Sequence, residues 1–267
     1  MQQVRRFYQH TELKGEPWNF SRKHFRVETL NGVWVKLNRL ENRLNPEELR
    51  GYLARYVPGH VYMSVTDWLF PERVGPKHKA RSAVPIGGEF AIDVDSYLGR
   101  RAHRHSISPV TGVCEGCLEV SKHLALELCD RVLDHYSRVQ VVFSGRRGFH
   151  VHVLDFSYRD WAKPNMGNPL KAMAAARFRY ALQVYGRHWD RSHFILSVDP
   201  MRVVTVPGTL NVDSGLICLN VGGAGDLEAL DIWGLLERAS PVSEIWGASF
   251  QNVTVALSPA RGDENVR

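Results

Sequence analysis

Glu89-Phe90-Ala91-Ile92-Asp93-Val94-Asp95 is the most informative stretch of the chain, and it is typical of a short buried strand that ends in two carboxylates. Successive side chains on a strand point to opposite faces, so Asp93 and Asp95 share one face with Ala91. Two neighbouring aspartates repel each other unless a cation lies between them, and hard divalent ions bind through such oxygen atoms. Taken alone, the pattern is more typical of a strand that ends in a solvated acidic turn.

The composition predicts a folded protein with a large core, because 44% of the 267 residues are hydrophobic. The net charge of +6 and the pI near 9.2 favour polyanionic partners. No stretch approaches the roughly 20 apolar residues of a membrane span, and Met1–Tyr8 lacks the apolar core of a signal peptide. We therefore expect a cytoplasmic, nucleoid-associated protein with no membrane partner.

Hydrophobic periodicity predicts strands separated by helices. We expect residues 71–88, with three prolines and three glycines, to form an exposed basic loop, and residues 258–267 to be a disordered tail. This order favours an α/β or α+β fold with a mixed or antiparallel sheet, in a single domain over residues 1–257. The predicted strands are 61–65, 139–143, 149–155, 194–198, 202–206 and 216–221; the predicted helices are 46–56, 115–136 and 169–189; and 228–257 should add a helix and a strand.

The first 40 residues interleave aromatic and basic side chains, including Phe7, Tyr8, Trp18, Phe25 and Trp34. Such a mixture suits a nucleic-acid surface. A cap packed on a basic domain would have the same composition, so both interpretations stay open.

Ser144-Gly145-Arg146-Arg147-Gly148 joins two predicted strands, and His150 and His152 follow on one face of the second strand. The glycines permit a tight turn whose backbone amides can approach a ligand closely. Arg146 and Arg147 offer guanidinium groups that match phosphate oxygens. The turn therefore has the parts of a phosphate-binding site, although a charged hairpin tip with solvent-facing histidines has the same sequence.

A further carboxylate, Asp199, closes the predicted strand 194–198 and is followed by Arg202 and by the turn that carries Thr209 and Asn211. Asp199 could complete a metal site begun by Asp93 and Asp95. An Asp-Pro pair is usually only a strand end or a turn, and most such aspartates bind nothing.

Two of the four cysteines have the spacing of a zinc site. Cys114 and Cys117 follow His103 and His105, and four such ligands suit a tetrahedral structural zinc in a small knuckle at about residues 100–118. The histidines could instead belong to a basic loop with their neighbouring arginines.

The order of these motifs resembles the archaeo-eukaryotic primase superfamily, most closely its small catalytic primase subunit, over roughly residues 4–221. The resemblance implies a catalytic core with an RNA-recognition-motif-like sheet, a second αβ unit and a zinc motif. It implies an enzyme, a DNA primase or primase-polymerase, that makes RNA or DNA primers on single-stranded DNA. The implied substrates are a template, a primer and nucleoside triphosphates, and the implied partners are a large primase subunit or a helicase.

The resemblance also implies roles for individual residues. Asp93, Asp95 and Asp199 would be the catalytic carboxylates that hold two Mg²⁺ or Mn²⁺ ions. The incoming nucleotide would contact Ser144, Arg146, Arg147, Gly148, His150, Arg202, Thr209 and Asn211. This chain departs from the family in the short interval from Asp199 to Arg202 and in Asn211, where a histidine is usual. That form is more similar to plasmid and viral primase-polymerases.

Three other functions fit parts of the pattern. A repair or gap-filling polymerase of the same superfamily would use the same residues. A nucleic-acid-binding module without catalysis would gain nothing from an acidic cluster that faces phosphates. A metal-dependent phosphodiesterase would use similar aspartates but has little need for the arginine-rich turn.

Overall fold

The structure, a computed structural model, describes residues 1–38, 44–75, 84–95, 112–161, 167–185, 194–196 and 199–241. The predicted acidic strand is β6 (Phe90–Asp95), which lies inside a five-stranded sheet of order β13-β7-β8-β6-β9. All pairings in this sheet are antiparallel, which is one of the two sheet types that we predicted. The other strands are β7 (Val139–Phe143), β8 (Gly148–Val153), β9 (Phe194–Leu196) and β13 (Leu219–Gly222).

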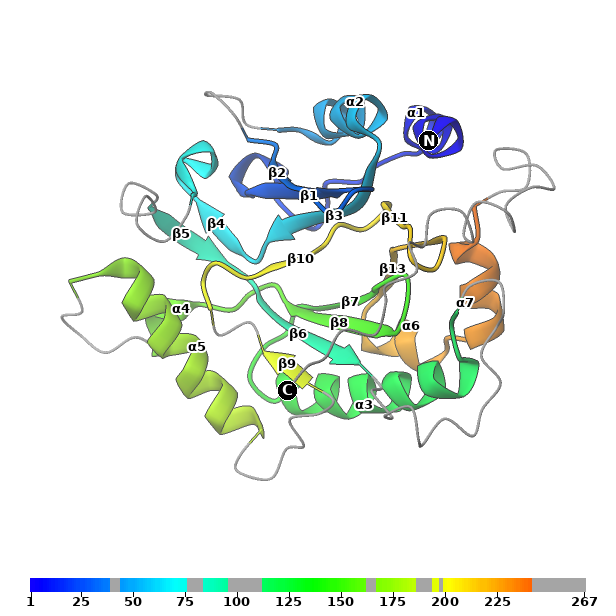
Figure 1. Ribbon diagram of the computed structural model, residues 1–267. Helices are drawn as coiled ribbons and strands as arrows, with labels where there is room; N and C mark the ends of the chain where they lie inside the picture. Colours follow the sequence, from blue (N-terminus) through cyan, green and yellow to red (C-terminus); the bar gives the residue numbers. More distant parts are fainter. Residues whose placement is uncertain are drawn as a thin grey trace, which may run out of the picture.

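Helices cover the face of this sheet that carries the apolar side chains of β6 (Figure 1). Phe90, Ile92 and Val94 are fully buried there because helix side chains pack on them. The covering helices are α3 (Glu115–Leu133), α5 (Pro169–Tyr185), α6 (Ala224–Glu228) and α7 (Ile232–Ala239), and the short α4 (Tyr158–Trp161) packs on α5.

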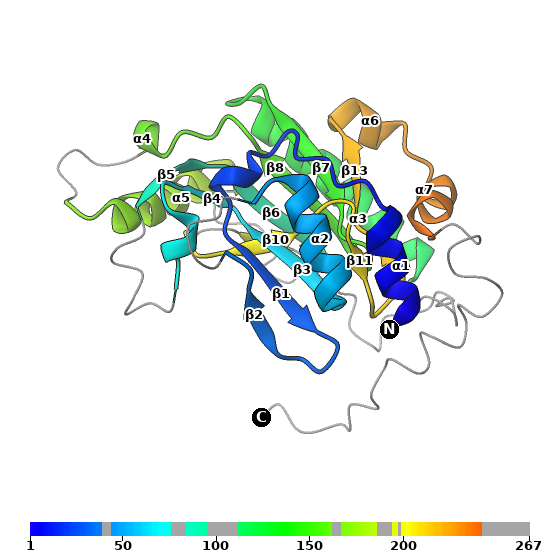
Figure 2. The ribbon, with the colours of Figure 1, turned by 90° about the horizontal axis from the view of Figure 1, so that it is seen from above.

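A second layer, built mainly from the N-terminal residues, lies on the opposite face of the five-stranded sheet (Figure 1). It is a four-stranded antiparallel sheet of order β10-β3-β1-β2, with α1 and α2 packed above it (Figure 2). Its elements are α1 (Gln2–His10), the 3₁₀ turn η1 (Phe20–Arg22), β1 (Phe25–Thr29), β2 (Trp34–Lys36), α2 (Pro46–Tyr56), β3 (Pro58–Ser64) and β10 (Val203–Thr205).

The sequence signals of α2 are confirmed in detail. The Asn45 side chain accepts a hydrogen bond from the Glu48 amide at 2.8 Å, and the Glu48 carboxylate accepts one from the Asn45 amide at 2.9 Å. This reciprocal capping box satisfies two amides that the first turn of a helix leaves unpaired. The helix ends at Tyr56, before Val57 at a φ of 49°.

Two small antiparallel pairs complete the described part of the chain, and one of them corrects a prediction. β5 (Pro85–Gly88) pairs with β4 (Thr66–Trp68), so these residues form a strand and not an exposed loop. Gly88 makes the pairing possible, because a Cβ there would lie 2.4 Å from the Val65 carbonyl oxygen. Residues 76–83 of the predicted loop lie outside the described residues, as do 242–267, which include the predicted tail. The remaining elements are η2 (Pro71–Arg73), β11 (Leu210–Asn211) and β12 (Leu216–Ile217).

Element ends differ modestly from the predictions. The helix predicted over 115–136 ends at Leu133, and the strand predicted from Val61 already begins at Pro58. Among the described helices, none is long and apolar enough to cross a membrane.

Candidate active site

The antiparallel register of β6 and β8 brings the acidic strand against the histidine strand. Asp93 lies opposite His150 and Asp95 opposite Gly148. The Nε2 atom of His150 is 3.5 Å from Asp93 Oδ1, and an Arg202 guanidinium nitrogen is 3.5 Å from Asp93 Oδ2. Residues from three separate segments therefore meet at one carboxylate. The sequence analysis predicted nucleotide contacts for His150 and Arg202, and those contacts stay a prediction.

Electrostatics at this carboxylate pair favour a cation. Burial raises the pKa of Asp93 to about 6, although the positive charge of Arg202 opposes the shift. Burial and the Asp93 charge both raise the pKa of Asp95. Burial lowers the pKa of His150 to about 3, so this imidazole is neutral at pH 7 and does not neutralise the aspartates. His150 is buried, which corrects the alternative of solvent-facing histidines.

The turn between β7 and β8 lies directly beside Asp95. Gly148 is required there, because a Cβ would lie 1.9 Å from the Val94 carbonyl oxygen and 3.1 Å from Asp95 Oδ1. Gly145 has a φ of +82°, a conformation that other residues rarely adopt. The Ser144 amide donates to the Gly148 carbonyl at 2.9 Å and closes the turn.

The two arginines of the turn are held differently. A guanidinium nitrogen of Arg146 lies 2.5 Å from Asp213 Oδ2, while the Arg147 side chain is exposed and its carbonyl accepts a bond from the Ser121 hydroxyl at 3.3 Å. Asp213 was not predicted as a site residue. It lies only two positions after Asn211, but nothing in its sequence context indicates a partner 67 positions away.

Asp199 lies in the turn before β10 and is exposed. Its Oδ1 accepts a hydrogen bond from the Met201 amide at 2.9 Å, and its carbonyl accepts one from the Arg202 amide at 3.0 Å. These bonds stabilise the turn. Within the described ranges no three His, Cys, Asp or Glu side chains lie close enough to hold one metal ion, so a carboxylate set of Asp93, Asp95 and Asp199 stays a prediction.

Asn211 lies beside the turn at residues 144–148, and Thr209 lies two residues before Asn211. The Thr209 hydroxyl is buried and donates to the Val206 carbonyl at 2.6 Å. Asn211 Oδ1 accepts a bond from the Asp213 amide at 3.1 Å, and its Cβ is 3.1 Å from the position that a Cβ on Gly145 would take. Both side chains support the local backbone, and Asn211 borders the turn.

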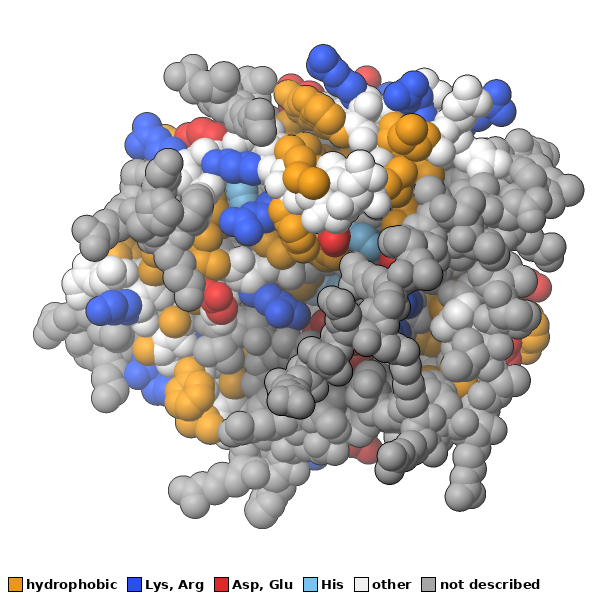
Figure 3. Space-filling view, viewed as in Figure 1, with side chains coloured by type: hydrophobic (Ala, Val, Ile, Leu, Met, Phe, Trp, Pro, Cys, Tyr) orange, Lys and Arg blue, Asp and Glu red, His pale blue; other side chains and the backbone are white. Residues whose placement is uncertain are grey.

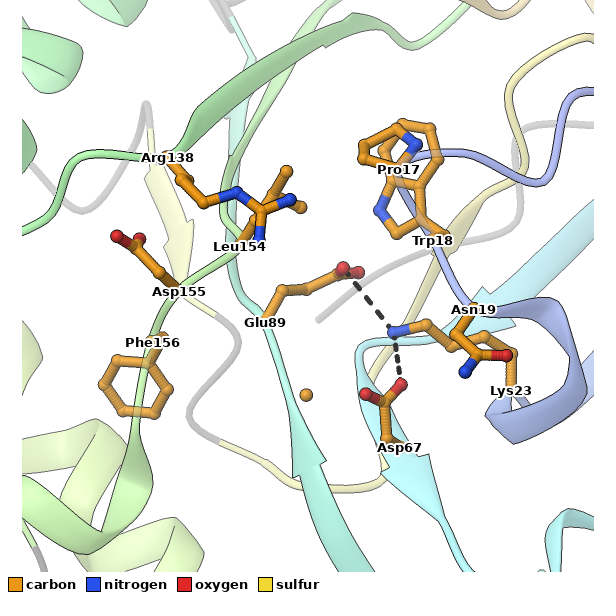
Figure 4. Close-up of a pocket in the computed structure, with 11 residues that line it drawn as sticks. Pro17, Trp18, Asn19, Lys23, Asp67, Glu89, Arg138, Leu154, Asp155 and Phe156 are labelled. Atoms are coloured by element: carbon orange, nitrogen blue, oxygen red, sulfur yellow. Dashed lines mark ion pairs between the residues drawn. The ribbon is translucent and has the colours of Figure 1, made fainter.

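A buried charge network that sequence reasoning missed involves Glu89, the residue directly before β6 (Figure 4). Lys23 Nζ lies 3.0 Å from Asp67 Oδ1 and 3.5 Å from Glu89 Oε2. On its other side Glu89 Oε1 is 3.3 Å from His152 Nδ1. Strand alternation places Glu89 on the same face as Asp93, and this alternation is the sequence signal that could have pointed to Glu89. The network borders a cavity of about 230 Å³ that is also lined by Pro17, Trp18, Asn19, Gly88, Arg138, Leu154, Asp155 and Phe156.

Two of the four residues of the predicted zinc site lie in the described part of the chain. Cys114 occupies the N-cap position of α3 and Cys117 lies in the first turn of that helix, and both are buried. His103 and His105 lie outside the described residues.

Sequence comparison identifies relatives in the family that the motifs resemble, although no family model matches the chain. The chain is 28% identical over 226 residues to the DNA primase small subunit PriS of Pyrobaculum calidifontis, which covers 73% of this chain and 69% of that protein. It is 25% identical to PriS of Methanocaldococcus jannaschii over 53% of this chain and 43% of that protein. It is 22% identical to PriS of Sulfolobus acidocaldarius over 66% and 62%.

Among solved structures, the polymerase domain of Mycobacterium tuberculosis ligase D in complex with DNA matches with a TM-score of 0.45 and 10% identity, over 91% of this chain and 89% of that one. The sequence relatives carry the comparison: those to which the chain is similar are DNA primase small subunits, at 22–28% identity. The resemblance predicted from the motifs is therefore confirmed.

Proposed function

We propose that this chain is a DNA primase or primase-polymerase, a template-directed nucleotidyltransferase that makes short RNA or DNA primers on single-stranded DNA. The observation that carries the proposal is the pair of largely buried carboxylates, Asp93 and Asp95, beside an arginine-rich glycine turn. A buried negative pair next to a phosphate-binding turn suits a substrate that arrives with metal ions and a triphosphate.

The residues present fit divalent ions of the Mg²⁺ or Mn²⁺ type. Asp93 and Asp95 provide hard oxygen donors, and a cation would relieve the mutual repulsion that raises the pKa of Asp95. We propose Asp199 as the third carboxylate of the set. Held by these carboxylates, two such ions would supply activation of the primer hydroxyl and neutralisation of the triphosphate and pyrophosphate charge.

The remaining residues bind and orient the nucleotide. Arg146, which is held by Asp213, and the exposed Arg147 present guanidinium groups to phosphate oxygens. His150 is neutral and can share a proton in a hydrogen bond without adding charge. Arg202 screens Asp93 in the free protein and can contact a phosphate or the template.

Four further residues have supporting roles in this proposal. Ser144 and Gly148 shape the phosphate-binding turn, and Thr209 and Asn211 form the adjacent border of the nucleotide pocket. We also propose that the five-stranded sheet is the RNA-recognition-motif-like sheet of the core, that the N-terminal sheet is its second αβ unit, and that both belong to one domain over residues 1–257.

A synthesis assay tests the proposal. The protein is incubated with a single-stranded template, labelled nucleotides and Mg²⁺ or Mn²⁺, with and without a primer. We expect product from the wild type and none from Asp93→Ala or Asp95→Ala, whereas Asp130→Ala, which removes an exposed carboxylate on α3, should behave as the wild type. Template binding without any product would exclude the enzyme, and template degradation would instead indicate a phosphodiesterase.

The same assay separates priming from repair. A gap-filling polymerase of the same superfamily would extend a primer across a short gap faster than it would begin a strand on an unprimed template. Because Asp93, His150 and Arg202 serve both reactions, the site geometry suits either one.

We also propose a structural zinc held by Cys114 and Cys117 together with His103 and His105. Its support is the position of the two cysteines at the start of α3, one turn apart and both buried. Zinc content measured on purified Cys114→Ser and Cys117→Ser should fall, with Cys129→Ser as the control. Unchanged zinc in the first two variants would refute the knuckle.

A further inference from the structure

The structure divides the aromatic residues of the N-terminal segment into two groups. Phe7, Tyr8, Trp18 and Phe25 are at most 4% exposed, so they form the cap that was one of our two interpretations. Trp34 is 52% exposed. Of these five aromatic residues, Trp34 is therefore the one that is exposed enough to belong to a nucleic-acid surface, which was our other interpretation.

Trp34 begins β2, in a hairpin that projects from the body of the molecule (Figure 2). Its ring stacks on the ring of Tyr62, with centroids 5.1 Å apart and planes inclined by 22°. The contact fixes one face of the indole, and the high exposure of Trp34 leaves ring surface open to solvent. An immobilised aromatic ring is a stacking surface for a nucleobase of any type.

Basic residues accompany Trp34 on the same face of the N-terminal sheet. The register pairs Arg26 with Lys36 and Glu28 with Trp34, so all four side chains share this face. Arg26 Nε donates to His24 Nε2 at 3.0 Å, and Lys36 Nζ donates to the carbonyls of Glu72 and Val74, so backbone and imidazole contacts position both cations. Hydrophobic and basic side chains lie together over this part of the molecule (Figure 3). With the cations Arg26 and Lys36 against the single carboxylate of Glu28, the net charge of these side chains is positive, which suits a phosphate backbone.

The face continues into the candidate active site at two points. His60, two residues before Tyr62, has its Nε2 atom 3.7 Å from Asp213 Oδ1, and Asp213 pairs with Arg146. β3, which carries Tyr62, also pairs with β10, which begins directly after Arg202. Trp34 therefore lies about 15 Å from the β10 line, three strand spacings across the sheet.

We propose that Trp34 stacks on a base of the unpaired template strand, and that Tyr62, Arg26 and Lys36 complete a track for this strand that leads to Asp93. The proposal rests on the proposed function, because it names the path of the template to that same site. A single strand is the occupant because its bases can leave the stack and lie on an aromatic ring, whereas duplex bases are already stacked.

The test is equilibrium binding of a labelled single-stranded oligonucleotide, without nucleotides and with a chelator. Trp34→Ala should bind about five- to hundredfold more weakly than the wild type, the range that one lost base stack produces. Trp34→Phe, which keeps a ring, should stay within about threefold. The matched control is Trp233→Ala, which removes a 63% exposed tryptophan from α7, and it should not change the affinity.

Two outcomes would overturn the proposal. One is wild-type affinity of Trp34→Ala for the single strand. The other is a change from dimer to monomer by light scattering with no loss of oligonucleotide affinity, which would make the tryptophan a contact between copies of the chain. Failure of the proposed function is distinguishable: the wild type would then bind the single strand through Trp34 but make no product in the synthesis assay.

Discussion

The buried position of Lys23 makes a quantitative prediction possible. The side chain is 1% exposed, and its Nζ atom lies between Asp67 at 3.0 Å and Glu89 at 3.5 Å. Replacing Lys23 with methionine keeps the volume of the aliphatic chain but leaves two carboxylates without their cation. Removing one partner of a buried ion pair costs about 3–5 kcal/mol, because the remaining charge stays desolvated.

The cost should depend on pH through Glu89. Burial alone would raise the pKa of Glu89, but the charge of Lys23 and the contact with His152 lower it below its ordinary value. In the wild type this lowered pKa contributes stability above about pH 4.3, and that contribution is lost as the pH falls through the folded-state pKa. In Lys23→Met, burial dominates and the pKa of Glu89 rises. Glu89 then takes up a proton as the pH falls from 7 towards 5, and the deficit shrinks.

Urea denaturation followed by circular dichroism measures both effects. We expect Lys23→Met to lose about 3–5 kcal/mol of unfolding free energy at pH 7, less at pH 5, and part of the loss to return in Lys23→Met/Glu89→Gln. The exposed Lys171, changed to methionine, should shift stability by less than about 0.5 kcal/mol. A loss below about 1 kcal/mol at pH 7, or one that is constant between pH 7 and 5, would refute the reasoning.

Three further perturbations have defined outcomes. Asp93→Asn should abolish synthesis yet raise the metal-free unfolding free energy at pH 7 by up to about 3 kcal/mol, because ionising a carboxyl whose pKa is raised to about 6 costs stability. That cost begins near the unfolded-state pKa of about 4 and is complete above about pH 6, so the gain should vanish below about pH 4 in a denaturation series. Gly148→Ala should lower the unfolding free energy by about 3 kcal/mol or more, because the new Cβ would lie 1.9 Å from a strand carbonyl oxygen. The control Gly51→Ala lies inside α2, where the new Cβ would meet no atom within 4 Å, and it should be neutral or stabilising. Asp213→Ala should raise the nucleotide KM about two- to fivefold in steady-state assays with kcat little changed, because Arg146 loses the partner that positions it. An unchanged KM would show that Arg146 does not bind the phosphates of the nucleotide.

Local signals explain which parts of the fold could be predicted. Alternation along Phe90–Asp95 and the glycine turn at 144–148 placed β6, β7 and β8, and the Asn45 cap placed the start of α2, because each depends on residues close together in the chain. Pro85–Gly88 was missed because prolines and glycines usually indicate a loop. Here Gly88 instead allows a close approach of β5 to β4, which no local pattern encodes.

Local sequence signals likewise account for only part of the candidate site. Alternation indicated that Asp93 shares a face with Asp95 and His150 with His152. It could not indicate that Asp93 lies opposite His150, because that depends on how the two strands pair. Lys23, Asp67 and Glu89 could not be grouped, since they come from separate segments and charged residues are rarely buried unless paired. Asp213 was missed for the same reason, because its partner Arg146 is distant in the sequence.

The N-terminal layer contacts β6 at two places, which explains why a buried charge network lies next to the acidic strand. At the start of the strand, Glu89 is tied by Lys23 to the N-terminal layer. At its other end, Asp93 is contacted by Arg202, whose position is set by β10 in that same layer. An error in the seating of one layer on the other would therefore move Arg202 away from Asp93. The Lys23 network fixes that seating, so Lys23→Met should weaken synthesis even under conditions in which the protein stays folded.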